Sequence, residues 1–206
     1  MSIESAIDLA EKTALYVDWI EVGTSLIKEF GMESVRKICT AFPNHTILAD
    51  MKISDNARYE CQLAFQAGAD VITVMGAAPV FTLRNVQEEA KKAGKQVIID
   101  LLNTSLEDQK KLRSMFPNTI FCLHTSKDEQ EELGSQLTTT LLDWKGYRLA
   151  IAGGVTLAAL PKLARIYQPE LFIVGGAITG EESVVQAAQA FQQAIRFQKT
   201  VKEQVK

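Results

Sequence analysis

Three charged residues lie close enough in the sequence to form a catalytic centre. Asp50, Lys52 and Asp55 belong to the segment Ala-Asp-Met-Lys-Ile-Ser-Asp, which continues an apolar run. In a β-strand, Asp50 and Lys52 point to the same side because side chains alternate along the strand. A lysine held between carboxylates stays protonated and can stabilise a developing enolate oxygen. We interpret the segment as catalytic; the alternative is a salt bridge at the rim of the fold with a helix N-cap at Asp55.

A further carboxylate, Glu21, ends an earlier apolar run. Carboxylates at the ends of two neighbouring strands provide hard oxygen ligands that suit Mg²⁺, which keeps several waters and binds substrate oxygens. The sequence therefore indicates an Mg²⁺ site at Glu21 and Asp50.

Polar residues also follow two later apolar runs. Asp100 and His124 each end such a run, and Lys127 follows shortly after His124. Because a charge at the end of an apolar strand is costly unless it pairs or binds something, Asp100 and Lys127 are possible substrate contacts. His124 is a candidate for proton transfer, with a hydrogen-bonded histidine at the rim of the fold as the alternative.

Two similar glycine pairs separate a strand-like run from a helix-like run near the C-terminus. The first pair is Gly153 and Gly154, and the second is Gly175 and Gly176. Glycine allows the backbone to approach a ligand closely and to turn its N–H groups toward a phosphate at a helix N-terminus. One such pair could be a tight turn and no more; two of them predict a phosphate-binding site.

Short apolar runs alternate with helical patterns along the whole chain. The runs are apolar on both faces, which is typical of parallel strands covered by helices. The strands that we predict are Val17–Val22, Thr46–Met51, Asp70–Met75, Gln96–Leu102, Thr119–His124, Arg148–Ala152 and Leu171–Val174.

Strict strand–helix alternation predicts either an open doubly wound sheet or a closed (β/α)8 barrel. The glycine pairs follow the last two predicted strands, where barrels bind phosphate, so we predict the barrel. The chain opens on a helical pattern with Ser2 as its N-cap. The first strand of the barrel is therefore predicted to be absent, and Asp8 to lie within a helix. The alternative is a shortened first strand, of which the run Ala6-Ile7-Asp8-Leu9 would be the remnant.

Length and composition favour a single enzyme domain. The 206 residues are 47% hydrophobic and 23% charged, with a net charge of −3. We expect one domain over residues 1–206, with a charged tail from about residue 197 to 206. The charge argues against a nucleic-acid partner, and no apolar run is long enough for a membrane helix. Three well-separated cysteines favour buried thiols in a reducing cytoplasm.

Taken together, these motifs resemble the orotidine 5′-monophosphate decarboxylase superfamily, in the branch that contains 3-hexulose-6-phosphate synthases and 3-keto-L-gulonate-6-phosphate decarboxylases. The resemblance covers about residues 2 to 196. It rests on His124, on the two glycine pairs, and on the segments Ile20–Thr24, Ala49–Asp55 and Ala67–Val74.

The resemblance implies a role for each matched residue. Glu21 and Asp50 would bind Mg²⁺, Lys52 would stabilise an enediolate, and His124 would transfer a proton. Asp55 would reach across a homodimer interface into the partner's site. Gly153, Gly154, Gly175 and Gly176 would hold the phosphate of a sugar-phosphate substrate.

Within this branch the sequence is more similar to the synthases. The decarboxylases carry Ala-Gly-Arg after the last strand, where this chain has Gly175-Gly176-Ala177, and an arginine in the place of Lys127. The resemblance implies a lyase that performs Mg²⁺-dependent aldol addition of formaldehyde to D-ribulose 5-phosphate. The decarboxylase is the alternative. A catalytically impaired phosphosugar-binding paralogue is another, because members of the family begin with a strand whose substrate-contacting Asp has no match here.

Overall fold

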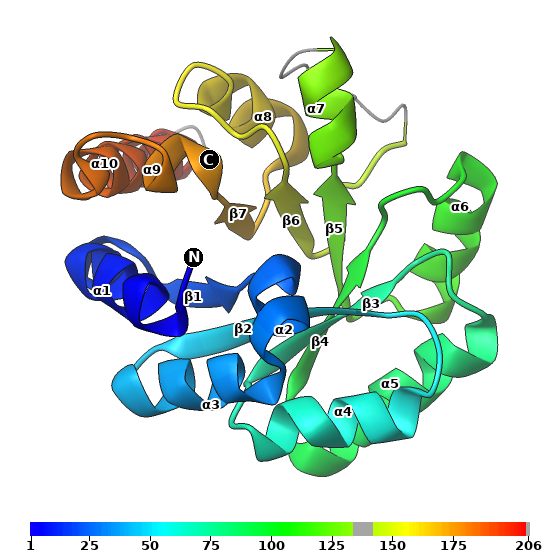
Figure 1. Ribbon diagram of the computed structural model, residues 1–206. Coiled ribbons are helices and arrows are strands. Elements are labelled where there is room, and N and C mark those ends of the chain that lie inside the picture. The colour runs from blue at the N-terminus through cyan, green and yellow to red at the C-terminus, as the bar shows by residue number, and fades with distance from the viewer. Residues whose placement is uncertain (134–141, 205–206) are drawn as a thin grey trace.

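The sheet of this protein is built from parallel strands in sequence order. The structure is a computed structural model and describes residues 1–133 and 142–204. Within those residues, seven strands form one curled sheet in the order β1 to β7, and every neighbouring pair is parallel (Figure 1). The strands are β1 (Trp19–Val22), β2 (Thr46–Ile53), β3 (Val71–Met75), β4 (Gln96–Asp100), β5 (Ile120–His124), β6 (Leu149–Ala152) and β7 (Leu171–Ile173).

Helices lie outside the curled sheet and link successive strands (Figure 1). The predicted strands are confirmed, with ends that move by one to two residues. The helices are α1 (Ile3–Thr13), η1 (Ala14–Tyr16), α2 (Thr24–Phe30), α3 (Met32–Ala41), α4 (Ala57–Gln66), α5 (Val80–Ala93), α6 (Leu106–Met115), α7 (Lys127–Leu133), α8 (Leu160–Tyr167), α9 (Gly176–Thr179) and α10 (Val184–Gln204).

Both faces of the sheet are buried, which explains why the strands are apolar throughout. Alternate residues such as Leu48, Val71 and Ile98 pack together inside the curl of the sheet. Residues between them, such as Ile47 and Ile72, pack against the helices outside. The last residues of the inward series on β2, β4 and β5 are polar, so the period of two brings polar groups to one end of the sheet.

The curled sheet does not close within the described residues. Helix α1 begins at the predicted N-cap, Ser2, whose hydroxyl accepts from the Ser5 amide at 3.1 Å. Strands β1 and β7 are the two edges of the sheet and face each other across a gap flanked by α1 and α10 (Figure 1). A cavity of about 900 Å³ lies there. This confirms the prediction of a (β/α)8-type barrel that lacks its first strand.

Three further expectations concern the C-terminal tail, membrane helices and the cysteines. Helix α10 continues to Gln204 and so includes most of the predicted charged tail; residues 205–206 lie outside the described part of the chain. In the part of the chain that the structure describes, no helix is long and apolar enough to cross a membrane. Cys61 and Cys122 are buried, Cys39 is half-buried, and all three are free thiols.

Candidate active site

Polar side chains from three strands meet at the carboxyl end of the sheet. The Lys52 amine lies 3.0 Å from Asp50 Oδ2 on its own strand and 2.9 Å from Asp100 Oδ2 on β4. His124 on β5 places its Nδ1 2.8 Å from the same oxygen of Asp100. The predicted residues Asp50, Lys52, Asp100 and His124 are thus brought together as one hydrogen-bonded series, with the buried Asp100 at its centre.

The charges of this series reinforce one another. Burial by itself lowers the pKa of Lys52, but the charges of Asp100 and Asp50 outweigh it, so the pKa is raised and the amine stays protonated. Burial likewise opposes ionisation of Asp100, but hydrogen bonds and charges from His124 and Lys52 hold its pKa below the ordinary value. The Leu102 amide adds a hydrogen bond to Asp100 Oδ1 at 2.9 Å. At neutral pH the site therefore holds a lysine cation between two carboxylates.

Two threonines that sequence reasoning missed hold the Asp50 carboxylate. The Thr24 hydroxyl lies 2.5 Å from Asp50 Oδ2 and 2.9 Å from the Asp50 carbonyl oxygen. The Thr73 hydroxyl on β3 donates to Asp50 Oδ1 at 2.7 Å. The sequence signal that could have identified Thr73 is its polar side chain at an inward position of the otherwise apolar strand β3.

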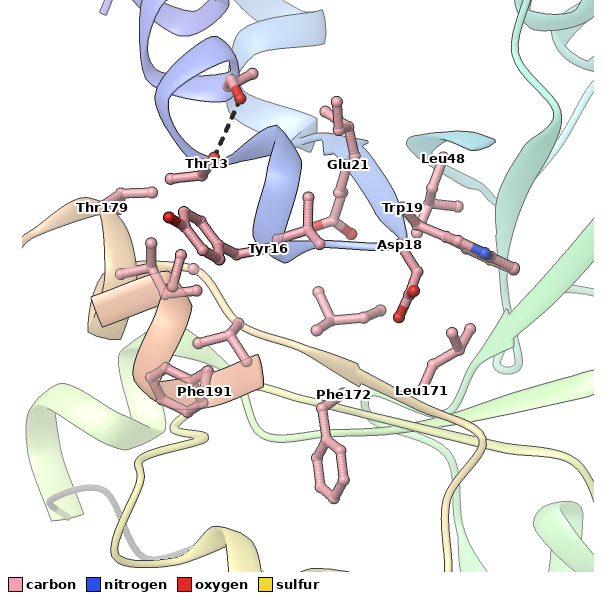
Figure 2. A pocket seen from close by; sticks show the side chains of 18 of the residues that line it. Thr13, Tyr16, Asp18, Trp19, Glu21, Leu48, Leu171, Phe172, Thr179 and Phe191 are labelled. Carbon is pink, nitrogen blue, oxygen red and sulfur yellow. Dashed lines mark hydrogen bonds between the residues drawn. The ribbon is translucent and has the colours of Figure 1, made fainter. Parts of the chain in front are cut away.

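Glu21 stands at the boundary between this series and the open side of the sheet. Its side chain projects from β1 into the cavity between β1 and β7, and Asp18 and Leu171 also point into that space (Figure 2). Glu21 is exposed to the cavity, yet the surrounding protein and the charge of Asp50 raise its pKa to about 7. Of the causes, desolvation by the protein is the largest.

The predicted metal ligands fit Mg²⁺ in their chemistry. Among the residues described, no three His, Cys, Asp or Glu side chains gather as a complete metal site. Mg²⁺ does not need one, because it is commonly bound by one or two carboxylates together with waters and substrate oxygens. The charge of Asp50 disfavours ionisation of Glu21, and a divalent cation between the two carboxylates would relieve that repulsion.

The two glycine pairs end neighbouring strands, β6 and β7, but they have different conformations. Gly153 and Gly154 have φ values of 78° and 68°, and a Cβ at Gly153 would lie 2.0 Å from the Thr125 carbonyl oxygen. Gly175 has a φ of −101°, and a Cβ there or at Gly176 would meet nothing within 4 Å. The first turn therefore requires glycine for its own geometry, whereas the second leaves open space beside its backbone.

Three residues singled out from the sequence lie outside this hydrogen-bonded series. Asp55 is exposed, and the interpretation of Asp55 as the N-cap of the next helix is wrong: the N-cap of α4 is Asn56, in a left-handed conformation. Lys127 is exposed at the start of α7 and lies 3.6 Å from Glu131 on the same helix. Asp8 pairs with Lys12 on the outer surface of α1, as the prediction that it belongs to a helix implies.

Comparison with known proteins shows which enzymes the chain is similar to. Residues 1–191 match the model of the Orotidine 5′-phosphate decarboxylase / HUMPS family. The chain is 37% identical over 199 residues to a 3-hexulose-6-phosphate synthase of Bacillus subtilis, covering 95% of this chain and 94% of that one. A crystal structure of the synthase from Salmonella typhimurium is similar with a TM-score of 0.85 and 29% identity, covering 96% and 95% of the two chains. A 3-keto-L-gulonate-6-phosphate decarboxylase from Vibrio cholerae gives 0.80 and 30%, covering 95% and 92%.

Proposed function

The chain belongs to the Orotidine 5′-phosphate decarboxylase / HUMPS family, and from that premise we propose that it is a lyase of the 3-hexulose-6-phosphate synthase type. The reaction is the reversible aldol addition of formaldehyde to D-ribulose 5-phosphate, which gives D-arabino-hex-3-ulose 6-phosphate. The observation that carries the proposal is the Lys52 cation, held between Asp50 and Asp100 at the end of the sheet where the glycine turns lie.

Lys52 supplies the positive charge that the reaction needs. Removal of a proton from C1 of the ketose leaves negative charge on oxygen, as an enediolate. A cation fixed by two carboxylates stabilises that charge without reorganising, which is the main way in which preorganised sites accelerate such steps. The enediolate carbon then forms a bond with the formaldehyde carbon, and the former carbonyl oxygen of formaldehyde takes up a proton.

His124 is the group that we assign to proton transfer. Because Nδ1 faces Asp100 at 2.8 Å, Nε2 is the ring nitrogen left for a substrate. Asp100 fixes the orientation of the imidazole and, through Lys52, links it to the cation that stabilises the enediolate. Asp100 therefore acts within the site rather than as a freely exposed substrate contact.

Glu21 and Asp50 are the residues that would hold Mg²⁺. When bound there, Mg²⁺ supplies a Lewis acid for the oxygens of the ketose. Gly175 and Gly176 leave open space beside their backbone for the phosphate, and the Gly153–Gly154 turn would flank it from the neighbouring strand. Lys127, at the start of α7 beyond β5, is assigned as a contact of the phosphate.

We also propose that the active form is a homodimer. Asp55 follows the catalytic strand β2 and is exposed. An exposed carboxylate at that position is suited to complete a site on a second copy of the chain. The three free thiols support a reducing, cytoplasmic location.

Decarboxylation of 3-keto-L-gulonate 6-phosphate is the second candidate, and the likeness to the Vibrio cholerae decarboxylase favours it. Both reactions pass through an enediolate, so the same Lys52 geometry serves both. Ala177 and Lys127 stand where the decarboxylase pattern has arginines, and this distinguishes the chain from the decarboxylases.

The test compares the two substrates on the purified 206-residue chain. We expect loss of formaldehyde with D-ribulose 5-phosphate and Mg²⁺, and much slower release of CO₂ from 3-keto-L-gulonate 6-phosphate. Faster CO₂ release would assign the decarboxylase instead. Calorimetric binding of D-ribulose 5-phosphate without turnover of either substrate would show an impaired phosphosugar-binding protein and refute the proposal.

A further inference from the structure

The catalytic strand β2 is irregular at the residues that carry the chemistry. Ala49 on β2 pairs with Ile72 on β3, and the next pair is Ile53 with Val74. Three residues of β2, Asp50 to Lys52, therefore lie opposite one residue of β3, Thr73. Such a bulge breaks the regular ladder of backbone hydrogen bonds and turns side chains in a new direction.

The side chain of Thr73 takes the place of the broken ladder. The Lys52 amide donates to Thr73 Oγ1 at 2.8 Å, and the same hydroxyl donates to Asp50 Oδ1 at 2.7 Å. Thr73 is 3% exposed, so water does not readily replace either bond. One buried hydroxyl thus connects the backbone of the lysine to the side chain of the aspartate.

The backbone of Lys52 needs this support. Its φ is 48°, in the left-handed region that residues other than glycine seldom adopt. Strained conformations of this kind persist where the surroundings fix them, and they cluster at functional sites. A partly buried amide without an acceptor would add to the strain, and the Thr73 hydroxyl is the acceptor.

We propose that Thr73 is a positioning residue that holds the β2 bulge and thereby aims Lys52 and Asp50 at the reacting atoms. Thr24, at the start of α2, restrains the other oxygen of Asp50, but Thr73 alone among these contacts bonds to both Asp50 and Lys52. Its role in turnover rests on the proposed function, whereas its role in the bulge does not. The hydroxyl, and not the size of the side chain, carries the effect.

Three variants separate the hydroxyl from the packing. Thr73→Val keeps the shape and removes the hydroxyl, and Thr73→Ser keeps the hydroxyl. Thr119→Val is the control, since Thr119 is a buried threonine that precedes β5 at the opposite end of the sheet. Thermal unfolding of each variant shows how much of any effect is lost stability.

The first readout is hydrogen exchange of the Lys52 amide by NMR, which requires no substrate. We expect protection of that amide to fall by about tenfold or more in Thr73→Val, because its acceptor is gone, and to survive in Thr73→Ser and Thr119→Val. The second readout is turnover. We expect kcat of Thr73→Val to fall on the order of 10- to 100-fold with KM little changed, and serine to restore most of it.

Each outcome decides the proposal. Unchanged protection of the Lys52 amide in Thr73→Val, or loss of protection in Thr73→Ser that matches valine, overturns it. If the wild-type chain turns over neither substrate, the proposed function fails, and the exchange experiment still judges the bulge. If Thr73→Val does not fold, Thr73→Ala provides the same comparison without the branched side chain.

Discussion

Polar groups have different surroundings in two regions of the curled sheet: the closed side, from β2 to β5, and the open side, at the gap between β1 and β7. From β2 to β5, the described carboxylates at the strand ends are each hydrogen-bonded, as Asp50 is to Thr24 and Thr73 and Asp100 is to Lys52 and His124. Between β1 and β7, Glu21 faces a cavity of about 900 Å³ and its pKa rises to about 7. The closed side is preorganised, whereas the open side places a carboxylate where a cation would be stabilising.

Because of this contrast, the residues proposed for catalysis do not depend on whether the barrel is closed. The cation between two carboxylates lies on β2 and β4, each of which has a neighbouring strand on both sides, so it does not depend on the strand edges at the gap. Glu21 alone of the predicted catalytic and metal residues belongs to an edge strand. Changes on the closed side should therefore affect turnover most, and changes on the open side should affect metal binding.

The largest effect is expected from removing the cation. Lys52→Ala leaves Asp50 and Asp100 without their shared partner, and turnover should fall about 1,000-fold or more. Stability should fall by about 3 kcal/mol because a buried charge loses its partner. The matched control is Lys95→Ala, which removes a partly exposed ion pair with Asp70 at the other end of the sheet. Steady-state kinetics and urea unfolding measure both; a Lys52→Ala enzyme with a tenth of wild-type turnover would contradict the assignment.

A smaller loss is expected when only the charge of Asp100 is removed. Asp100→Asn keeps the shape, but it weakens the hold on Lys52 and His124, so kcat should fall about 100-fold. The pKa of Asp100 is lowered in the folded protein, so its contribution to stability is present above pH about 3.8 and is lost as the pH falls through the lower folded value. The variant should thus lose less stability than wild type on acidification.

Unfolding of both proteins between pH 7 and pH 3 checks this sign. Asp8→Asn serves as the control, because Asp8 lies on the outer surface of α1. A parallel loss of stability in wild type and Asp100→Asn would show that Asp100 is not bound as a stabilised carboxylate.

Sequence patterns predicted the strands and the end of the sheet at which the chemistry lies, because both follow from local alternation. Regular alternation predicts Asp50 and Lys52 on one face, and the two side chains do meet, although the strand bulges at these residues. Polar residues that end neighbouring parallel strands lie at the same end of the sheet. Asp100 pairs with Lys52 and His124 and so links β4 to β2 and β5. These partners of Asp100 could not be predicted without knowing the register of the three strands. The alternative interpretation of Asp55 as an N-cap is not met, because Asn56, in a left-handed conformation, is the N-cap of α4.

The bulge in β2 was also beyond sequence reasoning. Nothing in the local pattern of Ala49 to Ile53 distinguishes a regular strand from one with extra residues, because the register is set by the neighbouring strand. The two glycine pairs were predicted as equivalent from their similar sequences. They differ in conformation because Gly153 follows the interior strand β6 and lies against the carbonyl of Thr125, the residue after the neighbouring strand β5. Gly175 instead follows the edge strand β7.

That difference gives the next prediction. Gly153→Ala should destabilise the protein by about 2 kcal/mol, because its φ of 78° strains an L side chain and the new Cβ would clash with Thr125. Gly175→Ala should change stability by roughly 0.5 kcal/mol or less. Urea unfolding measures both, and KM for D-ribulose 5-phosphate shows whether Gly175→Ala narrows the phosphate site. Equal destabilisation by the two substitutions would remove the contrast between the paired and the edge strand.

The smallest effect is expected from Mg²⁺ binding on the open side. The pKa of Glu21 is raised to about 7, so its stabilising contribution is complete below the ordinary value of 4.5 and is lost as the pH rises through 7. Mg²⁺ binds the ionised form, so it should raise the Tm by a few degrees at pH 8 and by less at pH 5.5.

Glu21→Gln should remove the pH dependence of this shift and most of the shift itself. Glu29→Gln is the matched control, because Glu29 lines the same cavity without belonging to the predicted ligands. The measurement needs no substrate: thermal unfolding with and without Mg²⁺, with Ca²⁺ and Na⁺ at equal ionic strength to exclude screening. If the Mg²⁺-induced rise in Tm persists in Glu21→Gln but is lost in Asp50→Asn, the metal binds wholly on the closed side. The proposed contrast, with catalysis on the closed side and metal binding on the open side, would then be wrong.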